Sequence, residues 1–367
     1  MAASPQPFGA GPQLIRRDIV RLTLPGPHKV MRCTLRCFLV VFLLAGLACA
    51  SARAAAALLL EEPFGEFGAM NPTGHAAIYL TRVCADTPLR LRRCREGEDG
   101  VVLSRYHGID GYDWLAIPLL AYLYAVEDPA EIPASATPGL EVKLRDRYRR
   151  EHLEFLVPDD PKHEIPRGDW IQLVGASYDR RIWGFEVTTT PEQDEQLIAR
   201  FNHRRNISRF NLLFNNCANF SQRVLNFYYP HAVHRNFIAD AGVMTPKQAA
   251  KSLVKYSRRH PETDLRTFVI PQVPGAIRRS TPVDGVVESL VKSKKYVVPL
   301  AILNPYVTGT LVAAYLGDGR FHPDPHAQVF RPAQQFEPGE PAAEQPVAAN
   351  DDTAAPGMTQ AAEISRP

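Results

Sequence analysis

The chain has 367 residues, of which 45% are hydrophobic and 22% are charged, the composition of an ordinary globular protein. Its 42 basic and 39 acidic side chains nearly cancel and leave a formal net charge of +3. Because no basic stretch is interleaved with aromatic residues, we expect no nucleic-acid partner.

The N-terminal residues 1–56 have the features of a secretory signal peptide. A basic start precedes an apolar run from Cys37 to Ala50, and small residues that fit an Ala-x-Ala cleavage site follow. The alternative is an uncleaved anchor over residues 37–60, which is long enough to cross a bilayer. In both cases the preceding basic residues stay inside and the remainder is exported. We therefore expect a periplasmic or cell-envelope protein, with membrane association through this segment if it remains as an inner-membrane anchor.

The cysteines divide between the targeting segment and the exported part. Of the six cysteines, the exported part keeps Cys84, Cys94 and Cys217. An oxidising compartment favours a disulfide wherever two cysteines can meet. Cys84 and Cys94 flank a sequence typical of a turn between two strands, so we expect them to pair. Cys217 is then left as a lone thiol, which invites a functional explanation.

Alternating and helical patterns follow one another from residue 57 to 270, the expected catalytic domain. Turn-forming residues predict a loop over 57–73, and strict alternation predicts a strand over 75–83 with His75, Ala77 and Tyr79 on one face. Further strands are expected at 89–94, 100–106, 170–174 and 182–187, and helices at 114–127 (broken early by Pro118), 140–156, 190–204, from 217 and from 245. In helix 140–156 we expect a solvated face made by Arg145, Arg147, Arg149 and Arg150.

The C-terminal part shows weaker patterns. Residues 271–322 form an extension with an apolar segment over 296–317, where Pro299, Asn304 and Pro305 interrupt a length that could otherwise span a bilayer. Lysines before this segment and an acidic tail after it oppose the positive-inside tendency, which favours a hairpin over a membrane span. Residues 323–367 are rich in Pro, Ala, Gln and Glu, and predict a disordered tail.

The strongest local signal surrounds Cys217. Asn216 is a favoured N-cap, which places Cys217 in the first turn of a helix. Unpaired backbone N–H groups and the helix dipole at that position stabilise a thiolate, so we expect a thiol pKa lowered toward neutrality. An apolar stripe should bury this helix against a sheet: Phe220, Val224, Leu225 and Tyr228.

A thiol nucleophile needs a base from a neighbouring element of the fold. His75 begins a predicted strand directly after Gly74, where a small residue allows close approach of a substrate. We therefore assign His75 as the base. The backbone N–H of Cys217 is the expected oxyanion donor, together with a second donor that the sequence does not identify.

These motifs carry a resemblance to a known family. Residues 74–79 (Gly-His-Ala-Ala-Ile-Tyr) followed by 216–220 (Asn-Cys-Ala-Asn-Phe) resemble the circularly permuted NlpC-type papain-like thiol hydrolases, the group related to lecithin retinol acyltransferase. The resemblance spans about residues 70–260, and an uncharacterised exported bacterial branch is the nearest in pattern. It implies an α+β fold in which an antiparallel sheet packs on a helix that bears the cysteine at its N-terminus.

The family pattern also places a third polar residue on the strand after the histidine strand. His107 is the favoured match here, Ser104 is the alternative, and Asp110 follows. The resemblance implies a cysteine hydrolase, an amidase or peptidase that acts through a thioester on envelope peptides. The alternatives are a lipid-directed acyltransferase or thioesterase, and a non-catalytic envelope scaffold. The expected partner is thus a peptide or acyl substrate, with no cofactor and no metal.

Overall fold

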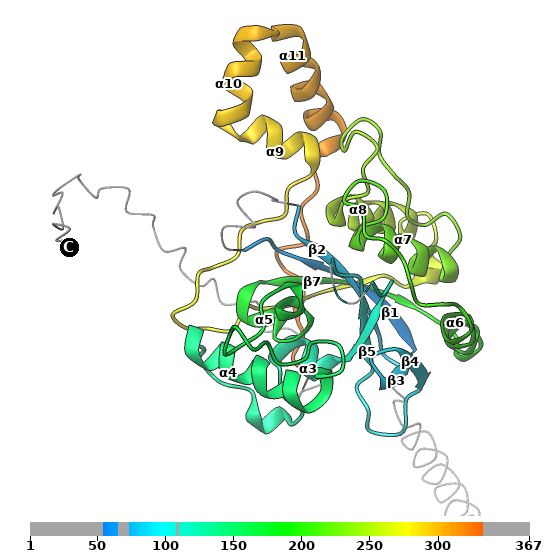
Figure 1. Ribbon diagram of the computed structural model, residues 1–367. Helices are drawn as coiled ribbons and strands as arrows, with labels where there is room; N and C mark the ends of the chain where they lie inside the picture. The colour runs from blue at the N-terminus through cyan, green and yellow to red at the C-terminus, as the bar shows by residue number, and fades with distance from the viewer. Residues whose placement is uncertain (1–53, 65–72, 108, 110, 333–367) are drawn as a thin grey trace, which may run out of the picture. The chain divides into compact units, whose positions relative to one another are not determined.

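A computed structural model of the chain describes residues 54–64, 73–107, 109 and 111–332. The expected signal peptide or anchor lies almost wholly outside these residues, as does Asp110. The architecture is mixed α+β, with a mostly antiparallel seven-stranded sheet and a separate two-stranded hairpin (Figure 1).

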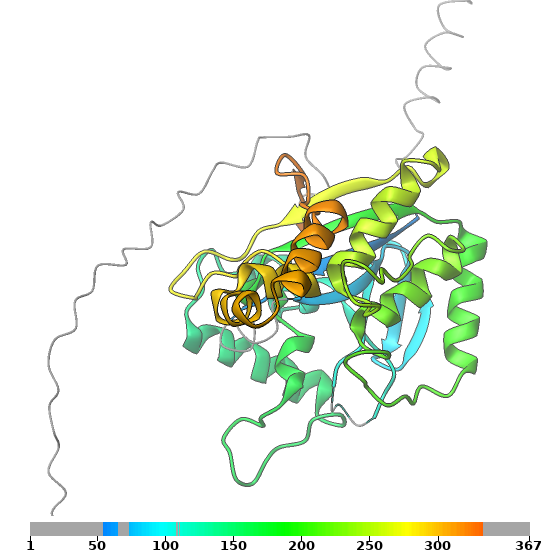
Figure 2. The same cartoon turned by 90° about the horizontal axis from the view of Figure 1, so that it is seen from above.

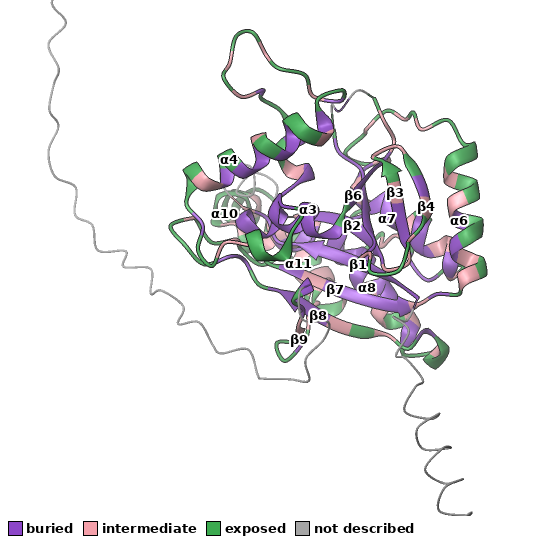
Figure 3. Ribbon diagram, turned by 90° about the horizontal axis from the view of Figure 1, so that it is seen from below, coloured by how far each residue is buried: buried purple, intermediate pink, exposed green. Residues whose placement is uncertain are grey.

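The main sheet has the spatial order β6–β5–β2–β1–β7–β8–β9, in which only the β8–β9 pair is parallel. The bounds are β1 Ala55–Glu61, β2 His75–Leu80, β5 Val101–Ser104, β6 Leu115–Pro118, β7 Ile182–Thr188, β8 Arg266–Ile270 and β9 Gln328–Val329. Strand β1 lies at the centre and every one of its residues is buried, as Figure 3 shows. The loop expected over 57–73 is therefore wrong for residues 57–61, because this short apolar run is a strand covered on both faces.

Helices cover the two faces of the sheet (Figures 1 and 2). Ala77 and Tyr79 point into the core beneath α3 to α5, whereas Ala76, Ile78 and Leu80 point into the core beneath α6 to α8. This confirms the alternation predicted for the strand that begins at His75. The helix bounds are α3 Leu119–Tyr124, α4 Pro138–Tyr148, α5 Ala176–Asp179, α6 Pro191–His203, α7 Cys217–Tyr228 and α8 Pro246–Ser257.

The two-stranded hairpin carries the expected disulfide. Strands β3 (Val83–Thr87) and β4 (Arg90–Arg93) pair with each other, and Cys84 is bonded to Cys94. Cys217 is the free cysteine of the part of the chain that the structure describes.

Two predicted elements have a different secondary structure. The helix expected over 114–127 begins only after Pro118, because residues 115–118 form the edge strand β6, where a proline can end a strand. The strand expected over 170–174 is a 3₁₀ helix, η3 (Asp169–Leu173).

The arginine face expected on a helix over 140–156 is only partly solvated. Arg145 is buried between Glu141 and Asp179, and Arg149 is buried and paired with Asp146 and Asp159. The start of the expected disordered tail is also ordered, because β9 joins the sheet there.

The apolar segment over 296–317 forms a helical hairpin. The helix α9 (Val286–Lys292) leads into α10 (Lys294–Leu303) and α11 (Pro305–Ala314), and η5 (Tyr315–Gly319) follows. None of the residues of α10 or α11 is buried. No helix in the described ranges combines the length and the apolar character that a membrane span requires.

Candidate active site

Helix α7 carries Cys217 at its first position, as the sequence predicts. The side chain of Asn216 accepts a hydrogen bond from the backbone N–H of Asn219, and the side chain of Asn219 accepts one from the backbone N–H of Asn216. This reciprocal capping box fixes the first turn of the helix. The predicted stripe of Phe220, Val224, Leu225 and Tyr228 is buried in the core on that face of the sheet.

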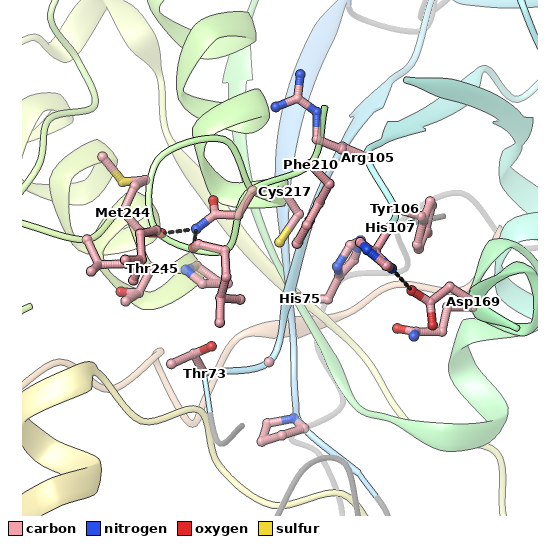
Figure 4. Close-up of a pocket in the computed structure, with 18 of the residues that line it drawn as sticks. Thr73, His75, Arg105, Tyr106, His107, Asp169, Phe210, Cys217, Met244 and Thr245 are labelled. Atoms are coloured by element: carbon pink, nitrogen blue, oxygen red, sulfur yellow. Dashed lines mark hydrogen bonds and ion pairs between the residues drawn. The ribbon is translucent and has the colours of Figure 1, made fainter. Parts of the chain in front are cut away.

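Asn216 has a second role that the sequence does not reveal. Its Nδ2 donates to the carbonyl of Leu212 at 2.7 Å and to the carbonyl of Met244 at 3.0 Å. One buried amide therefore ties the start of α7 to two loops that are far apart in the sequence. Figure 4 shows the bond to Met244 beside the cysteine.

The thiol opens into a pocket of about 550 Å³ that His75 also lines. Figure 4 shows Cys217 and His75 on neighbouring walls of this pocket. Most of the surface area that lines the pocket is apolar, and the polar lining residues include two arginines. The apolar lining residues are Pro63, Phe64, Phe210, Leu212, Leu213, Val243, Met244, Pro246 and Val286, and the polar ones besides His75 and Cys217 are Thr73, Arg105, Tyr106, His107, Asp169, Gln172, Arg180, Asn216 and Thr245.

A hydrogen bond to Ser104 fixes the orientation of His75. The Nε2 of His75 lies 2.7 Å from Ser104 Oγ, and both side chains are buried. Ser104 Oγ also lies 3.2 Å from the carbonyl of Ala76, which can take its single hydroxyl proton; in the tautomer that matches this arrangement, the serine oxygen accepts the hydrogen bond from Nε2–H. The other ring nitrogen, Nδ1, is then unprotonated and can act as a base.

A buried ionic cluster surrounds the imidazole. Glu61 lies opposite His75 in the sheet register, and it accepts hydrogen bonds from Tyr122 and, at 2.9 Å, from Arg180. The ring of Tyr106 stacks on that of His75 with 4.8 Å between centroids. Burial, with the charge of Arg180 as the second cause, lowers the pKa of His75 to about 3.

The environment of the sulfur opposes the expected thiolate. Burial raises the pKa of the Cys217 thiol to about 11, and the charge of Glu61 acts in the same direction. The backbone N–H groups of Ala76, Ala218 and Cys217 itself point to the sulfur and lower the pKa, but they do not outweigh burial. The expected lowering of the Cys217 thiol pKa toward neutrality is therefore wrong.

The thiol of Cys217 and the imidazole of His75 are thus both uncharged at neutral pH. The N–H that reaches the sulfur from β2 belongs to Ala76, the residue next to His75, so the thiol lies at the first residues of the histidine strand. Among the described residues, no direct hydrogen bond joins the sulfur to the imidazole. The arrangement fits general-base catalysis, in which the imidazole takes the thiol proton as the sulfur attacks.

His107 does not orient His75. Its side chain is 70% exposed, its Nδ1 lies 3.7 Å from Asp169, and its ring packs edge-on against Phe210. It lines the pocket, whereas Ser104 on β5 forms the hydrogen bond to the imidazole of His75. The preference for His107 is therefore corrected in favour of Ser104, because Ser104 lies on β5 beside β2 and its hydroxyl forms the hydrogen bond to His75.

Gly74 has a structural reason for its position that differs from the expected one. It has φ +67°, and a Cβ at this position would collide with the backbone carbonyl of Glu61. Only glycine therefore allows the chain to enter β2 at this point, which places His75 opposite Glu61.

Sequence reasoning did not identify the two pocket arginines. Arg180 is buried between Glu61 and the ring of Phe64, and it lies between the strands predicted at 170–174 and 182–187. Arg105 is also buried, donates to Asn215 and to the carbonyl of Asp113, and follows Ser104 directly. Burial, with Arg223 as a second cause, lowers the pKa of Arg105 to about 9. Arginine is common on surfaces, so nothing in the sequence marks these two as buried.

Comparisons of this chain with protein-family models, with curated proteins and with solved structures find no match.

Proposed function

We propose that this chain is a cysteine-dependent acyl hydrolase or acyltransferase with Cys217 as nucleophile and His75 as base. The observation that carries the proposal is the common pocket of about 550 Å³ into which the free thiol and the imidazole both open. The order of elements, with the histidine strand β2 before the cysteine helix α7, supports the permuted papain-like assignment on which the resemblance rests.

The proposed reaction has two steps. Nδ1 of His75 takes the thiol proton as the sulfur attacks the acyl carbonyl, and the resulting imidazolium gives that proton to the leaving group. The thioester on Cys217 is then cleaved by water or by another acceptor, which His75 activates in the same way. The backbone N–H of Cys217, in the first turn of α7, would turn from the sulfur to the developing oxyanion as its donor.

The lining of the pocket favours an apolar acyl group as the substrate. Phe64, Phe210, Leu213 and Met244 lie around the thiol, and a pocket with such walls gains binding free energy from burying hydrocarbon. An ester or thioester of an apolar acyl chain therefore fits better than a polar peptide. This makes the lipid-directed alternative the first candidate.

An amidase or peptidase remains the second candidate because one wall is polar. Asp169, Gln172 and Arg180 line the pocket on the side of His107. These groups can pair with peptide amides and carboxylates.

We propose export for the same chain. The Cys84–Cys94 disulfide supports an oxidising compartment, and the N-terminal signal or anchor would deliver the domain there. The substrate would then be an envelope lipid, an acylated molecule or an envelope peptide.

The test is capture of the acyl-enzyme. The full chain is incubated with p-nitrophenyl esters of acetate, octanoate and dodecanoate and with a peptide p-nitroanilide, and adducts are located by peptide mass spectrometry. The proposal predicts a hydroxylamine-sensitive adduct on Cys217 that forms faster with the longer acyl chains. Preference for the peptide would favour the second candidate.

Two variants complete the test. Cys217→Ala should form no such adduct, whereas Met244→Leu keeps an apolar wall of similar volume and should form it. A folded wild-type chain that is never acylated on Cys217 would leave only the scaffold alternative.

A further inference from the structure

The helical hairpin formed by α10 and α11 presents exposed apolar side chains that the proposed site does not use. Residues 296–316 contain no charged side chain. The residues at the turn of the hairpin are the most exposed: Ile302 at 77%, Leu303 at 82% and Tyr306 at 88%. Large apolar side chains at this exposure are costly in water, which indicates a surface that is covered in function.

The hairpin is fixed at its base and free at its turn. Glu288 of α9 forms a buried ion pair with Lys247 of α8, and Asp318 after α11 pairs with Lys251 at 2.6 Å. The backbone of α9 is also bound to the loop before α8 through Asp240. Both ends of the hairpin are therefore held by α8 and its preceding loop, and Figure 1 shows α10 and α11 extending beyond them.

Several polar groups of the turn are paired within the hairpin itself. Asn304 Oδ1 accepts from the backbone N–H of Val307 at 3.1 Å, and the Asn304 N–H donates to the carbonyl of Leu300 at 2.7 Å. The hydroxyl of Thr308 donates to the carbonyl of Asn304 at 3.1 Å, and Pro305 has no N–H to satisfy. Each of these bonds lowers the cost of moving the turn into hydrocarbon, where unpaired polar groups are expensive.

The length of the hairpin matches the thickness of one leaflet of a bilayer. Each helix has ten residues, so the hairpin extends about 15 Å, about half of a hydrocarbon core of roughly 30 Å. Apolar side chains lie all around α11, whereas docking on a protein requires only one apolar face.

The basic side chains at the base of the hairpin also support insertion into a membrane that contains anionic lipids. Lys294, Lys295 and Arg320 flank the uncharged segment at its base, where they can bind anionic headgroups. Tyr296 and Tyr315 lie next to them, at the level where aromatic side chains favour the membrane interface.

We propose that the α10–α11 hairpin inserts into one leaflet of an anionic lipid membrane and holds the domain on its surface. Val286, the first residue of α9, lines the pocket of Cys217. Insertion would therefore bring the mouth of this pocket close to the lipid headgroups. The proposal does not depend on the chemistry of the site.

The test measures the depth of the hairpin turn in lipid. The full-length variant Ile302→Trp is added to vesicles of phosphatidylcholine with phosphatidylglycerol, in which a fraction of the lipids carries bromine on the acyl chains. The expected result is a blue shift and strong quenching of the new tryptophan. The matched control is Ile207→Trp, an exposed apolar position outside the hairpin that should stay unquenched. In the Ile302→Trp background, Leu303→Asp should lower insertion of the turn by about 100-fold, since a carboxylate in hydrocarbon costs far more than leucine.

Three results would overturn the proposal. The new tryptophan could stay in water when the chain is bound to vesicles, which would show attachment through another segment. It could be quenched no more strongly than the control at position 207. It could shift to the blue without lipid in a concentration-dependent way, with no quenching by bromine, which would show pairing of two copies through the hairpin.

Discussion

Slow alkylation of Cys217 at neutral pH is the most specific consequence of its surroundings. A thiol pKa of about 11 leaves a thiolate fraction of about 10⁻⁴ at pH 7, compared with about 3% for free cysteine. This is about 300-fold less thiolate. The more basic thiolate is intrinsically more nucleophilic by about tenfold, so alkylation should be about 30-fold slower than for free cysteine.

The assay follows carbamidomethylation of Cys217 by iodoacetamide from pH 5 to 11, with peptide mass spectrometry to separate it from the N-terminal cysteines. The rate should rise about tenfold per pH unit up to the pKa of the thiol. His75→Gln should change this profile little, because the imidazole is neutral over the whole range. Fast labelling that reaches a plateau below pH 7 and is lost in His75→Gln would refute the neutral pair and show a thiolate–imidazolium pair instead.

Three further predictions concern the support of the site. Ser104→Ala leaves the buried Nε2–H of His75 without an acceptor, so we expect a loss of about 1–3 kcal/mol in unfolding free energy and a 10- to 100-fold slower acylation of Cys217. The control Ser104→Thr keeps the hydroxyl and should behave like wild type. Equal acylation rates in all three proteins would contradict this role of Ser104. Asn216→Ala removes the cap of α7 and the hydrogen bonds to Leu212 and Met244, so the unfolding free energy measured in urea should fall by about 1–3 kcal/mol. A decrease below about 0.5 kcal/mol would show that Asn216 is not needed to keep the two loops in place. The folded pKa of His75, about 3, lies below its unfolded value of about 6.5, so the unfolded chain binds more protons between these values and stability falls as the pH falls. Between pH 7 and pH 4, protonation linked to His75 should lower the unfolding free energy of the wild type by about 3 kcal/mol, and His75→Gln should lack this contribution. Identical dependence of stability on pH in the two proteins would show that His75 is not buried as a neutral imidazole.

The sequence predicted the elements whose signals are local. Alternation in residues 75–80 and the cap at Asn216 each depend on a few neighbouring residues, and the structure has both. The spacing of Cys84 and Cys94 around a turn likewise requires no long-range information.

The sequence did not predict features that depend on distant partners. Residues 55–61 looked like the end of a targeting segment followed by a loop, because their central place in the sheet depends on pairing with β2 and β7. Ser104 was the weaker candidate beside His107, since the sheet register that brings it to His75 is set by a partner 29 residues away. The raised pKa of Cys217 also results from burial by several separate elements rather than from its own helix.

The central claim is that His75 is the base for Cys217, and chemical rescue tests it most directly. The acylation of Cys217 by an activated ester is measured in wild type, in His75→Ala and in His75→Ala with added imidazole. We predict that the variant is slowed by about 10²–10⁴-fold and that free imidazole restores part of the rate, since the pocket has room for it. Acylation of Cys217 at the wild-type rate in His75→Ala would contradict the account.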